Sequence, residues 1–387
     1  MNPQQLSRKP PFSLLAEVGE QAYCPNPLES LPVIARGGIN LYSPAQHCPG
    51  YLALLCTEMV QRSPKFTTRG DIASLWFRGY PLRQLAAEDL TELVFRLGNH
   101  FDLHHNRGCD RGIHLSPEHC TRDNLALLRG LGFDVVRVIL DATVAGADSG
   151  INPFQRAITT VGEFTGLRLQ ATVSYSTETS AIYLGKALTS LAVASAEDID
   201  LEASLPPVVH SRHLTRCHRL FSQAESILLE NGYELFGDRC FKRSSHPHRV
   251  LRDNRRLAYG PWGFYNSEVR QWLGLGLGAE GLLDGYFYRN THHPEDYRAR
   301  LLSKAPTEIS WSTTPISQQP LYDLIQQLFC YHQVTDAGLL TALTLENLQK
   351  KSWLQCNNGH LQLTSAGIHN LQYLMREIIR LAGNDQT

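Results

Sequence analysis

The sequence predicts an α/β protein: an incomplete (β/α)6 barrel, an α/β cover segment and a C-terminal helical domain of the winged-helix type. Three observations lead to this prediction. Short apolar runs alternate with amphipathic helical patterns as far as Ala203. From Pro206 the pattern changes to one long helix and a segment rich in glycine and aromatic residues. From Gln319 helices dominate, with one short hairpin between them. Because strand–helix–strand repeats need right-handed crossovers, the first part should form a parallel sheet.

The hydrophobic period places each element of the barrel. Strands are expected at residues 33–42, 72–77, 112–115, 135–141, 169–175 and 199–203. Helices are expected at 51–62, 87–98, 121–131, 153–164 and 182–194, where apolar residues recur three and four positions apart. A full eight-unit barrel needs about 250 residues, and the pattern changes well before that length.

Beyond the barrel, residues 214–231 predict a long amphipathic helix that ends at Gly232, because glycine readily adopts the left-handed conformation. The segment 257–288 follows, and its glycine run lacks the strand–helix setting of a dinucleotide fingerprint. Helices at 321–331, 339–343 and 345–351, a hairpin near 359–367 and a last helix to Leu381 predict the winged-helix unit. The predicted domains are an N-terminal extension (1–30), the barrel (31–205), the cover segment (206–310) and the winged-helix-like domain (311–387).

Composition excludes several classes of function. The chain has 387 residues with 36 basic and 37 acidic side chains, so no net field steers it to nucleic acid or an anionic membrane. The region 345–352, where a winged helix would read DNA, has few basic groups. No apolar run predicts a membrane span or a signal peptide. Nine scattered cysteines predict reduced thiols in a cytoplasmic protein.

Motifs of the C-terminal half occur together in one known family. The segment 231–238, Asn-Gly-Tyr-Glu-Leu-Phe-Gly-Asp, and the segment 272–279, Trp-Leu-Gly-Leu-Gly-Leu-Gly-Ala, are followed by Leu-Thr-Ser-Ala-Gly at 363–367. In order and spacing they resemble motifs of the radical SAM family of oxygen-independent coproporphyrinogen III oxidases and haem chaperones (HemN and HemW). The resemblance covers roughly residues 30 to 380 and implies a radical-SAM-like partial TIM barrel.

The resemblance fails where that family holds its cofactors. The family's first strand ends in a C-x-x-x-C-x-x-C loop whose three thiolates hold a 4Fe–4S cluster. Here the strand is expected to run straight into a helix, with only Cys48 and Cys56 in this stretch. Bulky Arg78 and Tyr80 replace two small residues of the family's SAM-binding glycine motif, and His114 replaces a glutamate. The segments 132–141 and 170–175 lose further family residues. We therefore expect neither SAM nor a cluster to bind.

Because the losses fall on cofactor positions while the scaffold persists, the sequence favours a cluster-free protein of porphyrin or haem metabolism. Such a protein would bind a tetrapyrrole such as haem, or a partner protein of the haem pathway, without radical chemistry and without being an enzyme. One alternative is a radical SAM coproporphyrinogen III oxidase-like enzyme with a non-standard cluster on Cys24, Cys48 and Cys56. Another is a regulatory pseudoenzyme subunit of a true paralogue.

Candidate ligand-binding residues stand at or near the ends of successive predicted strands. These are Arg78, His114, Asp141, Tyr175 and Glu202. The carboxyl ends of parallel strands open onto one cavity, so these side chains should converge there. Internal salt bridges that fill a barrel without a ligand would use the same residues, with Arg137 as a further partner.

A second group lies in the cover segment. Arg256, with Arg249, Arg252 and Arg255 beside it, precedes Tyr259, Trp262 and Tyr265. Arginines suit the propionates of a porphyrin and aromatic rings suit its flat face, so Arg256, Tyr259 and Trp262 are candidate tetrapyrrole contacts. A basic turn that faces solvent explains the arginines equally well.

Histidines supply candidate haem ligands. His104 and His105 follow His100 and precede Cys109, and histidines four positions apart can bind a metal from one helical turn. A polar loop between a helix and a strand is the plainer interpretation. His246 and His248 flank a proline, which predicts an exposed turn.

Overall fold

Six parallel strands form the predicted barrel in the computed structural model, which describes residues 20–21, 34–63, 66–101, 103, 110–142, 148–204, 211–312, 320–335, 352–357 and 360–384. The strands are β2 (Ile34–Ser43), β3 (Phe66–Gly79), β4 (Asp110–Leu115), β5 (Val135–Asp141), β6 (Arg168–Ser176) and β7 (Asp198–Ser204). Each pairs in parallel with the next. The predicted strands are confirmed. β3 begins earlier than predicted because pairing with β2 extends it through a polar stretch.

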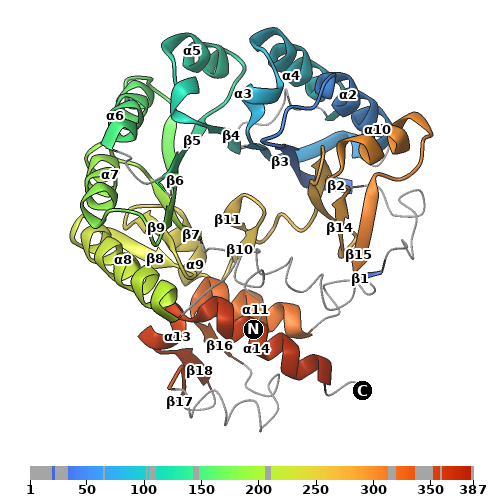
Figure 1. Ribbon diagram of the computed structural model, residues 1–387. Helices are drawn as coiled ribbons and strands as arrows, with labels where there is room; N and C mark the ends of the chain where they lie inside the picture. Colours follow the sequence, from blue (N-terminus) through green and yellow to red (C-terminus); the bar gives the residue numbers. More distant parts are fainter. Residues whose placement is uncertain are drawn as a thin grey trace.

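Helices follow the strands and cover the outside of the ring (Figure 1). They are α2 (Tyr51–Arg62), α3 (Pro81–Gln84), α4 (Ala87–Phe101), the 3-10 turn η5 (Pro117–His119), α5 (Arg122–Gly130), α6 (Asp148–Gly162) and α7 (Ala181–Val193). All five predicted barrel helices are confirmed, with α2 matching its predicted bounds.

The second half of the chain extends the same sheet at both edges. The sheet runs in the order β1-β15-β14-β13-β12-β2-β3-β4-β5-β6-β7-β9-β8. On the β2 side lie β12 (Trp272–Leu275), β13 (Glu280–Leu283), β14 (Tyr286–Asn290), β15 (Glu308–Ser312) and β1 (Glu20–Gln21); on the other side lie β9 (Cys240–Arg243) and β8 (Tyr233–Phe236). Within the described residues β1 and β8 do not pair with each other, so the barrel is open.

The hairpin of β10 (Leu257–Gly260) and β11 (Gly263–Asn266) lies within the ring of strands in Figure 1. Helix α9 (His248–Asp253) packs against this hairpin, whereas α8 (Ser211–Glu230) packs against α7 and α10 (Pro294–Leu302) against α2. Gly232, beyond α8, has φ +81°, so the predicted left-handed stop is confirmed.

The C-terminal unit contains α11 (Pro320–Tyr331), α13 (Ser365–His369) and α14 (Leu371–Asn384). A small antiparallel sheet joins them, formed by β16 (Gln333–Val334), β17 (Leu354–Asn357) and β18 (His360–Leu363). The β17–β18 pairing confirms the predicted hairpin. The helices predicted at 339–343 and 345–351 lie outside the described residues.

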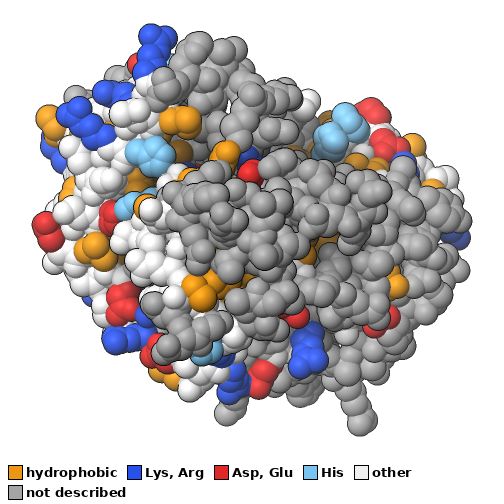
Figure 2. Space-filling view, turned by 90° about the horizontal axis from the view of Figure 1, so that it is seen from below, with side chains coloured by type: hydrophobic (Ala, Val, Ile, Leu, Met, Phe, Trp, Pro, Cys, Tyr) orange, Lys and Arg blue, Asp and Glu red, His pale blue; other side chains and the backbone are white. Residues whose placement is uncertain are grey.

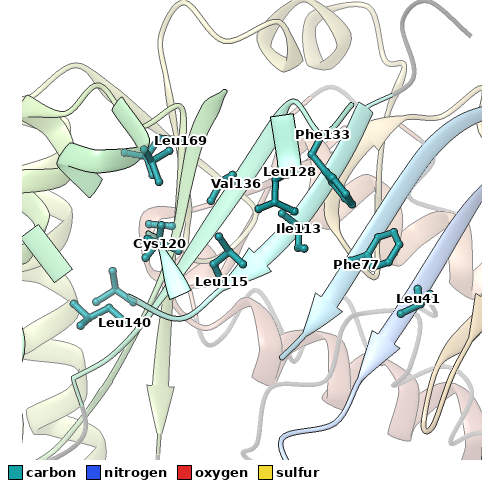
Figure 3. Packing of buried hydrophobic residues seen from close by; sticks show 14 of the residues in the cluster. Leu41, Phe77, Ile113, Leu115, Cys120, Leu128, Phe133, Val136, Leu140 and Leu169 are labelled. Atoms are coloured by element: carbon teal, nitrogen blue, oxygen red, sulfur yellow. The ribbon is translucent and has the colours of Figure 1, made fainter. Parts of the chain in front are cut away.

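The two faces of the barrel strands differ in chemistry. Side chains on the outer face are apolar and pack beneath the helices, as Figure 3 shows for Phe77, Ile113 and Val136 against Leu128 of α5. This burial of apolar surface is the main stabilising term of the barrel. The alternate residues, among them His114 and Arg137, face inward, because successive side chains of a strand point to opposite faces.

A buried carboxylate fastens α2 to the β12–β15 edge of the sheet. Glu58 of α2 is fully buried. It accepts hydrogen bonds from the Gly276 backbone N–H (2.7 Å), Asn290 Nδ2 (2.7 Å), Tyr297 Oη (2.6 Å) and Thr307 Oγ1 (2.9 Å). Four donors for one carboxylate offset much of the cost of burying its charge.

Arg62, one helical turn after Glu58, neutralises the same region. It forms an ion pair with Glu308 and donates a 2.6 Å hydrogen bond to Thr307 Oγ1. Its distance to Glu58 Oε1 is 3.7 Å. The network links the helix that follows the first strand to residues far along the chain.

Candidate ligand-binding site

A row of polar side chains crosses the inner face of the barrel at one level. In the strand registers His114 stands opposite Arg137, Arg137 opposite Gln170, Gln170 opposite Asp198, and Asp198 opposite Lys242. Arg137 donates from Nη2 to Gln170 Oε1 (2.6 Å) and lies 3.4 Å from Asp198 Oδ2. The interior of the barrel is therefore polar at this level.

An ion-pair network holds one end of this row together. Arg137 pairs with Asp200, and Lys242 pairs with Asp198. Burial alone would raise the pKa of Asp198, but the charges of Lys242 and Arg137 outweigh burial and hold this pKa well below its ordinary value. Internal salt bridges thus do fill part of the barrel. Cys240, Asp198 and Asp200 are close enough together to bind a cation, but the two cationic side chains already neutralise these carboxylates.

A cavity of about 170 Å³ lies beside the network. It is bounded by Arg78 and His114 at the ends of β3 and β4, by Glu202 of β7, and by Tyr259 and Trp262 of the β10–β11 hairpin. The structure therefore brings these five predicted site residues together. We call this space the lumen cavity.

Three tryptophans fill the barrel next to the lumen cavity. Trp76 of β3, Trp272 of β12 and Trp262 of the hairpin turn are each almost fully buried. The rings of Trp262 and Trp272 meet edge to face at 5.6 Å. A Cβ added at Gly112 would lie 2.4 Å from the Trp76 ring, so the ring packs directly on bare backbone. We call these three residues the tryptophan plug.

The position of the family's cluster loop is closed by a short, tightly bonded loop. The sequence predicted that the strand runs straight into the helix, and this prediction is wrong. Residues 44–50 form a loop between β2 and α2. Gln84, which is buried, donates to the carbonyls of Pro44 (2.8 Å) and Gln46 (2.7 Å) and accepts from the Cys48 backbone N–H (2.9 Å). Three hydrogen bonds from one side chain hold this loop in one conformation.

The two described cysteines of the predicted cluster set, Cys48 and Cys56, stand in surroundings that disfavour iron binding. Cys48 is buried in this loop, whereas Cys56 lies within α2 and faces charges of α4. Burial raises the pKa of both thiols, which disfavours the thiolates that iron needs. Cys24 lies outside the described residues, and no group of three cysteines occurs in the described part of the chain.

A larger cavity, of about 590 Å³, lies between the barrel and the C-terminal unit. We call it the outer cavity. Its walls come from the ends of β6 and β7, from α8, from the β8–β9 turn and from α13 and α14. The lining residues are Tyr175, Ala203, Leu214, Cys217, His218, Phe221, Asp238, Arg239, Trp353, His369, Asn370, Gln372, Tyr373 and Arg376.

Aromatic rings and charged groups alternate in the outer cavity. Trp353 and Tyr373 meet edge to face at 5.4 Å. His369 lies 3.0 Å from a carboxylate oxygen of Glu225, and this hydrogen bond raises the pKa of the histidine. Asp238 Oδ2 is buried without a hydrogen bond, and its nearest cation, Arg239, is 3.7 Å away. Because Asp238, Arg239 and Gln372 also line the lumen cavity, the two cavities adjoin.

Two predicted residues fall outside both cavities. Asp141 is exposed at the end of β5, because β5 extends beyond the level of the polar row. Arg256 is exposed and pairs with Glu268. Its neighbours Arg249 and Arg252 pair with Glu234, and the Arg252 guanidinium also lies over the ring of buried Phe236, whereas Trp262 lines the lumen cavity. The tetrapyrrole contact predicted at Arg256 stays a prediction, and it lies apart from the cavity that Tyr259 and Trp262 line.

The histidine predictions have different outcomes. His104, His105 and Cys109 lie outside the described residues. His246 is only 7% exposed, so the predicted exposed turn is wrong at this residue. Burial lowers the pKa of His246 to about 4, and Nδ1 of this residue accepts a 3.1 Å hydrogen bond from the His248 backbone N–H. This bond occupies one of its two possible iron-binding nitrogens.

Internal salt bridges with Arg137 were predicted from the sequence, but their partners Asp198 and Asp200 were missed, although a signal was present. In β7 the residues Asp198, Asp200 and Glu202 alternate with Ile199 and Leu201. A period of two with apolar residues on one face places the acidic residues on the other, which is the inner face of the barrel.

No family of known sequences matches the chain, and no curated protein matches it. Among solved structures it is similar to coproporphyrinogen III oxidase (HemN) from Escherichia coli, described as a radical SAM enzyme. The TM-score is 0.77 at 15% identity, over 91% of this chain and 92% of that one. Elp3 from Methanocaldococcus infernus, with an N-terminal deletion, gives a TM-score of 0.33 at 10% identity over 52% of this chain and 54% of that one, which is too low to support an inference.

The described helices include none long and apolar enough to cross a membrane. On the face shown in Figure 2, basic and acidic side chains of the described residues both occur, in keeping with the balanced composition. The similarity to the solved HemN structure extends over nearly the whole length of both chains. The chain therefore has the fold of HemN, a radical SAM protein.

Proposed function

We propose that this protein binds a planar, carboxylate-bearing ligand of the tetrapyrrole class in the outer cavity, without radical chemistry. The observation that carries the proposal is the outer cavity itself, about 590 Å³ with aromatic walls and the arginines Arg239 and Arg376. This volume is typical of sites that bury a small molecule or cofactor. Aromatic rings suit the flat face of a tetrapyrrole, and guanidinium groups suit its carboxylates.

The fold supports the ligand class. HemN, whose fold the chain shares, acts on coproporphyrinogen III, as its name states. The loop 44–50 and the tryptophan plug support the absence of radical chemistry, which is the other part of the proposal. They occupy space next to the strand ends where a parallel β/α barrel usually binds its ligand. The balanced charge gives no support to a nucleic-acid partner.

The first test is a titration with coproporphyrin III and, separately, with haem, followed by fluorescence and absorbance. We expect saturable binding at one site, with a dissociation constant in the micromolar range. Arg376→Gln should weaken binding by about tenfold, because one charge-assisted hydrogen bond contributes about 1.5 to 3 kcal/mol. Arg129→Gln, on the exposed surface of α5, is the matched control and should bind as the unaltered protein does. Absence of saturable binding, or binding that Arg376→Gln leaves unchanged, would contradict the proposal.

A second test addresses the cofactors. After anaerobic reconstitution with iron and sulfide, we expect no cluster absorbance and no stoichiometric iron, because burial raises the pKa of the Cys48 and Cys56 thiols and keeps them protonated at neutral pH. Calorimetry with SAM should give no heat of binding, and incubation with SAM and a reductant should give no 5′-deoxyadenosine. About four irons per chain together with micromolar SAM binding would instead support the radical SAM enzyme.

A further inference from the structure

Arg78 is a half-buried arginine whose guanidinium group has no carboxylate partner among the described residues. It forms no ion pair within the described part of the chain. The hydrogen bond from its Nη1 to Asn40 Oδ1 is long, at 3.5 Å, and its Nε is buried without an acceptor. Glu280 is the carboxylate whose charge acts on Arg78, but it forms its ion pair with Arg289, at 3.4 Å. An uncompensated buried charge is costly, so a fold that keeps one needs a reason to do so.

The side chain of His114, next to Arg78, brings no negative charge that would balance the guanidinium group. His114 makes no hydrogen bond to any described residue through either ring nitrogen. Burial lowers the pKa of His114 well below its ordinary value, and the charges of Arg137 and Arg78 lower it further. No carboxylate opposes these two cations at His114, so the ring is neutral at pH 7.

The carboxylates that line the same cavity form no ion pair with Arg78. Asp200 pairs with Arg137, and Asp238 lies 3.7 Å from Arg239. Glu202 lies on β7, on the far side of the cavity from β3, and has an interaction of its own. Unlike Arg137, whose charge two aspartates balance, Arg78 presents its guanidinium donors to a cavity of about 170 Å³.

We propose that the lumen cavity is a carboxylate-binding site in which Arg78 is the principal charged contact. A guanidinium fork matches the two oxygens of a carboxylate, and the neutral ring of His114 can donate one further hydrogen bond. Tyr259 and Trp262 of the hairpin close the site over the ligand. The site needs only a carboxylate, whether free or carried by a larger molecule in the adjoining outer cavity, so it stands or falls independently of the tetrapyrrole proposal.

The test uses the full chain with sodium acetate as the probe, at constant ionic strength maintained with chloride. His114 ring signals are followed by NMR and assigned by their loss in His114→Gln. Acetate should shift these signals and raise the pKa of His114, because a bound anion offsets the two guanidinium charges. Arg78→Met should weaken acetate binding at least about tenfold. Without acetate, its melting temperature should equal or exceed that of the unaltered protein, because an uncompensated charge is removed.

Two further variants complete the design. Arg83→Gln removes an arginine that pairs at the surface with Glu118 and should leave the acetate response unchanged. Arg78→Lys keeps the charge but loses the fork, so it should fold and bind acetate more weakly.

Acetate binding that Arg78→Met leaves intact would overturn the site. A melting temperature that falls in Arg78→Met, with no acetate response in the unaltered protein, would make Arg78 a structural residue. Binding of inorganic phosphate but not of acetate would overturn the assignment to carboxylates.

Discussion

Replacing Glu58 by alanine is expected to lower the free energy of unfolding by about 3 to 5 kcal/mol, the cost of breaking a buried charged network. The substitution leaves the Gly276 N–H, the Asn290 amide and the Tyr297 hydroxyl without their acceptor. Urea unfolding followed by circular dichroism measures the change. Glu92→Ala is the matched control: Glu92 is 46% exposed and pairs with Arg96, so its loss should cost less than about 1 kcal/mol.

The pH dependence of Glu58→Gln tests the same network in another way. Burial raises the pKa of Glu58 above its ordinary value of 4.5, despite the opposing charge of Arg62. Between the unfolded and folded pKa the folded state binds more protons, so this group's contribution to stability falls as pH rises through that interval. The variant lacks this contribution. The stability difference between the two proteins should therefore shift in favour of the variant as pH rises above 4.5, and curves that stay parallel would contradict a raised pKa.

Asp198→Asn should destabilise the protein by a similar amount, about 3 to 5 kcal/mol, because it leaves Arg137 and Lys242 buried with too little negative charge. Here the pKa is depressed in the folded state, so the stabilisation is present above the unfolded pKa, near 4, and is lost as pH falls below it. Unfolding by urea at pH 7 and at pH 3 should show that the difference between the two proteins shrinks in acid.

A double substitution tests whether the cost of the single changes comes from leaving one charge of the ion pair without its partner. Asp198→Leu combined with Lys242→Met removes both partners of one pair, and should be less destabilising than the sum of the two single changes. Asp253→Asn, at an aspartate that is 63% exposed, is the matched surface control and should change stability by less than about 0.5 kcal/mol. If Asp198→Asn behaved like Asp253→Asn, the network would not be a source of stability.

The barrel could be predicted because its signals are local. The amphipathic pattern of 51–62 and the apolar run of 135–141 gave elements with the bounds that the structure has. The pairing of β12 with β2 could not be predicted in this way. Which edge a short Gly-rich strand joins depends on packing against distant neighbours and not on its own period.

The candidate site was predictable only in part, for the same reason. Arg78, His114 and Glu202 line the lumen cavity because successive parallel strands bring their ends together. Asp141 and Arg256 have similar sequence settings, but the length of β5 and the pairing of Arg256 with Glu268 keep them outside. The outer cavity draws its residues from the ends of β6 and β7 and from separate later segments, and no periodicity relates Phe221 to Tyr373.

The Glu58 network also bears on how the protein is made. The residues that hold Glu58 in place lie 218 to 249 positions later in the chain. At a synthesis rate of roughly 5 to 20 residues per second, they leave the ribosome on the order of ten to fifty seconds after α2. Throughout that interval β2 has an unpaired edge. The carboxylate of Glu58, which is buried in the complete fold, is then solvated only by water. A nascent chain stalled near residue 205 would expose both features, so completion of the barrel must await the last third of the polypeptide.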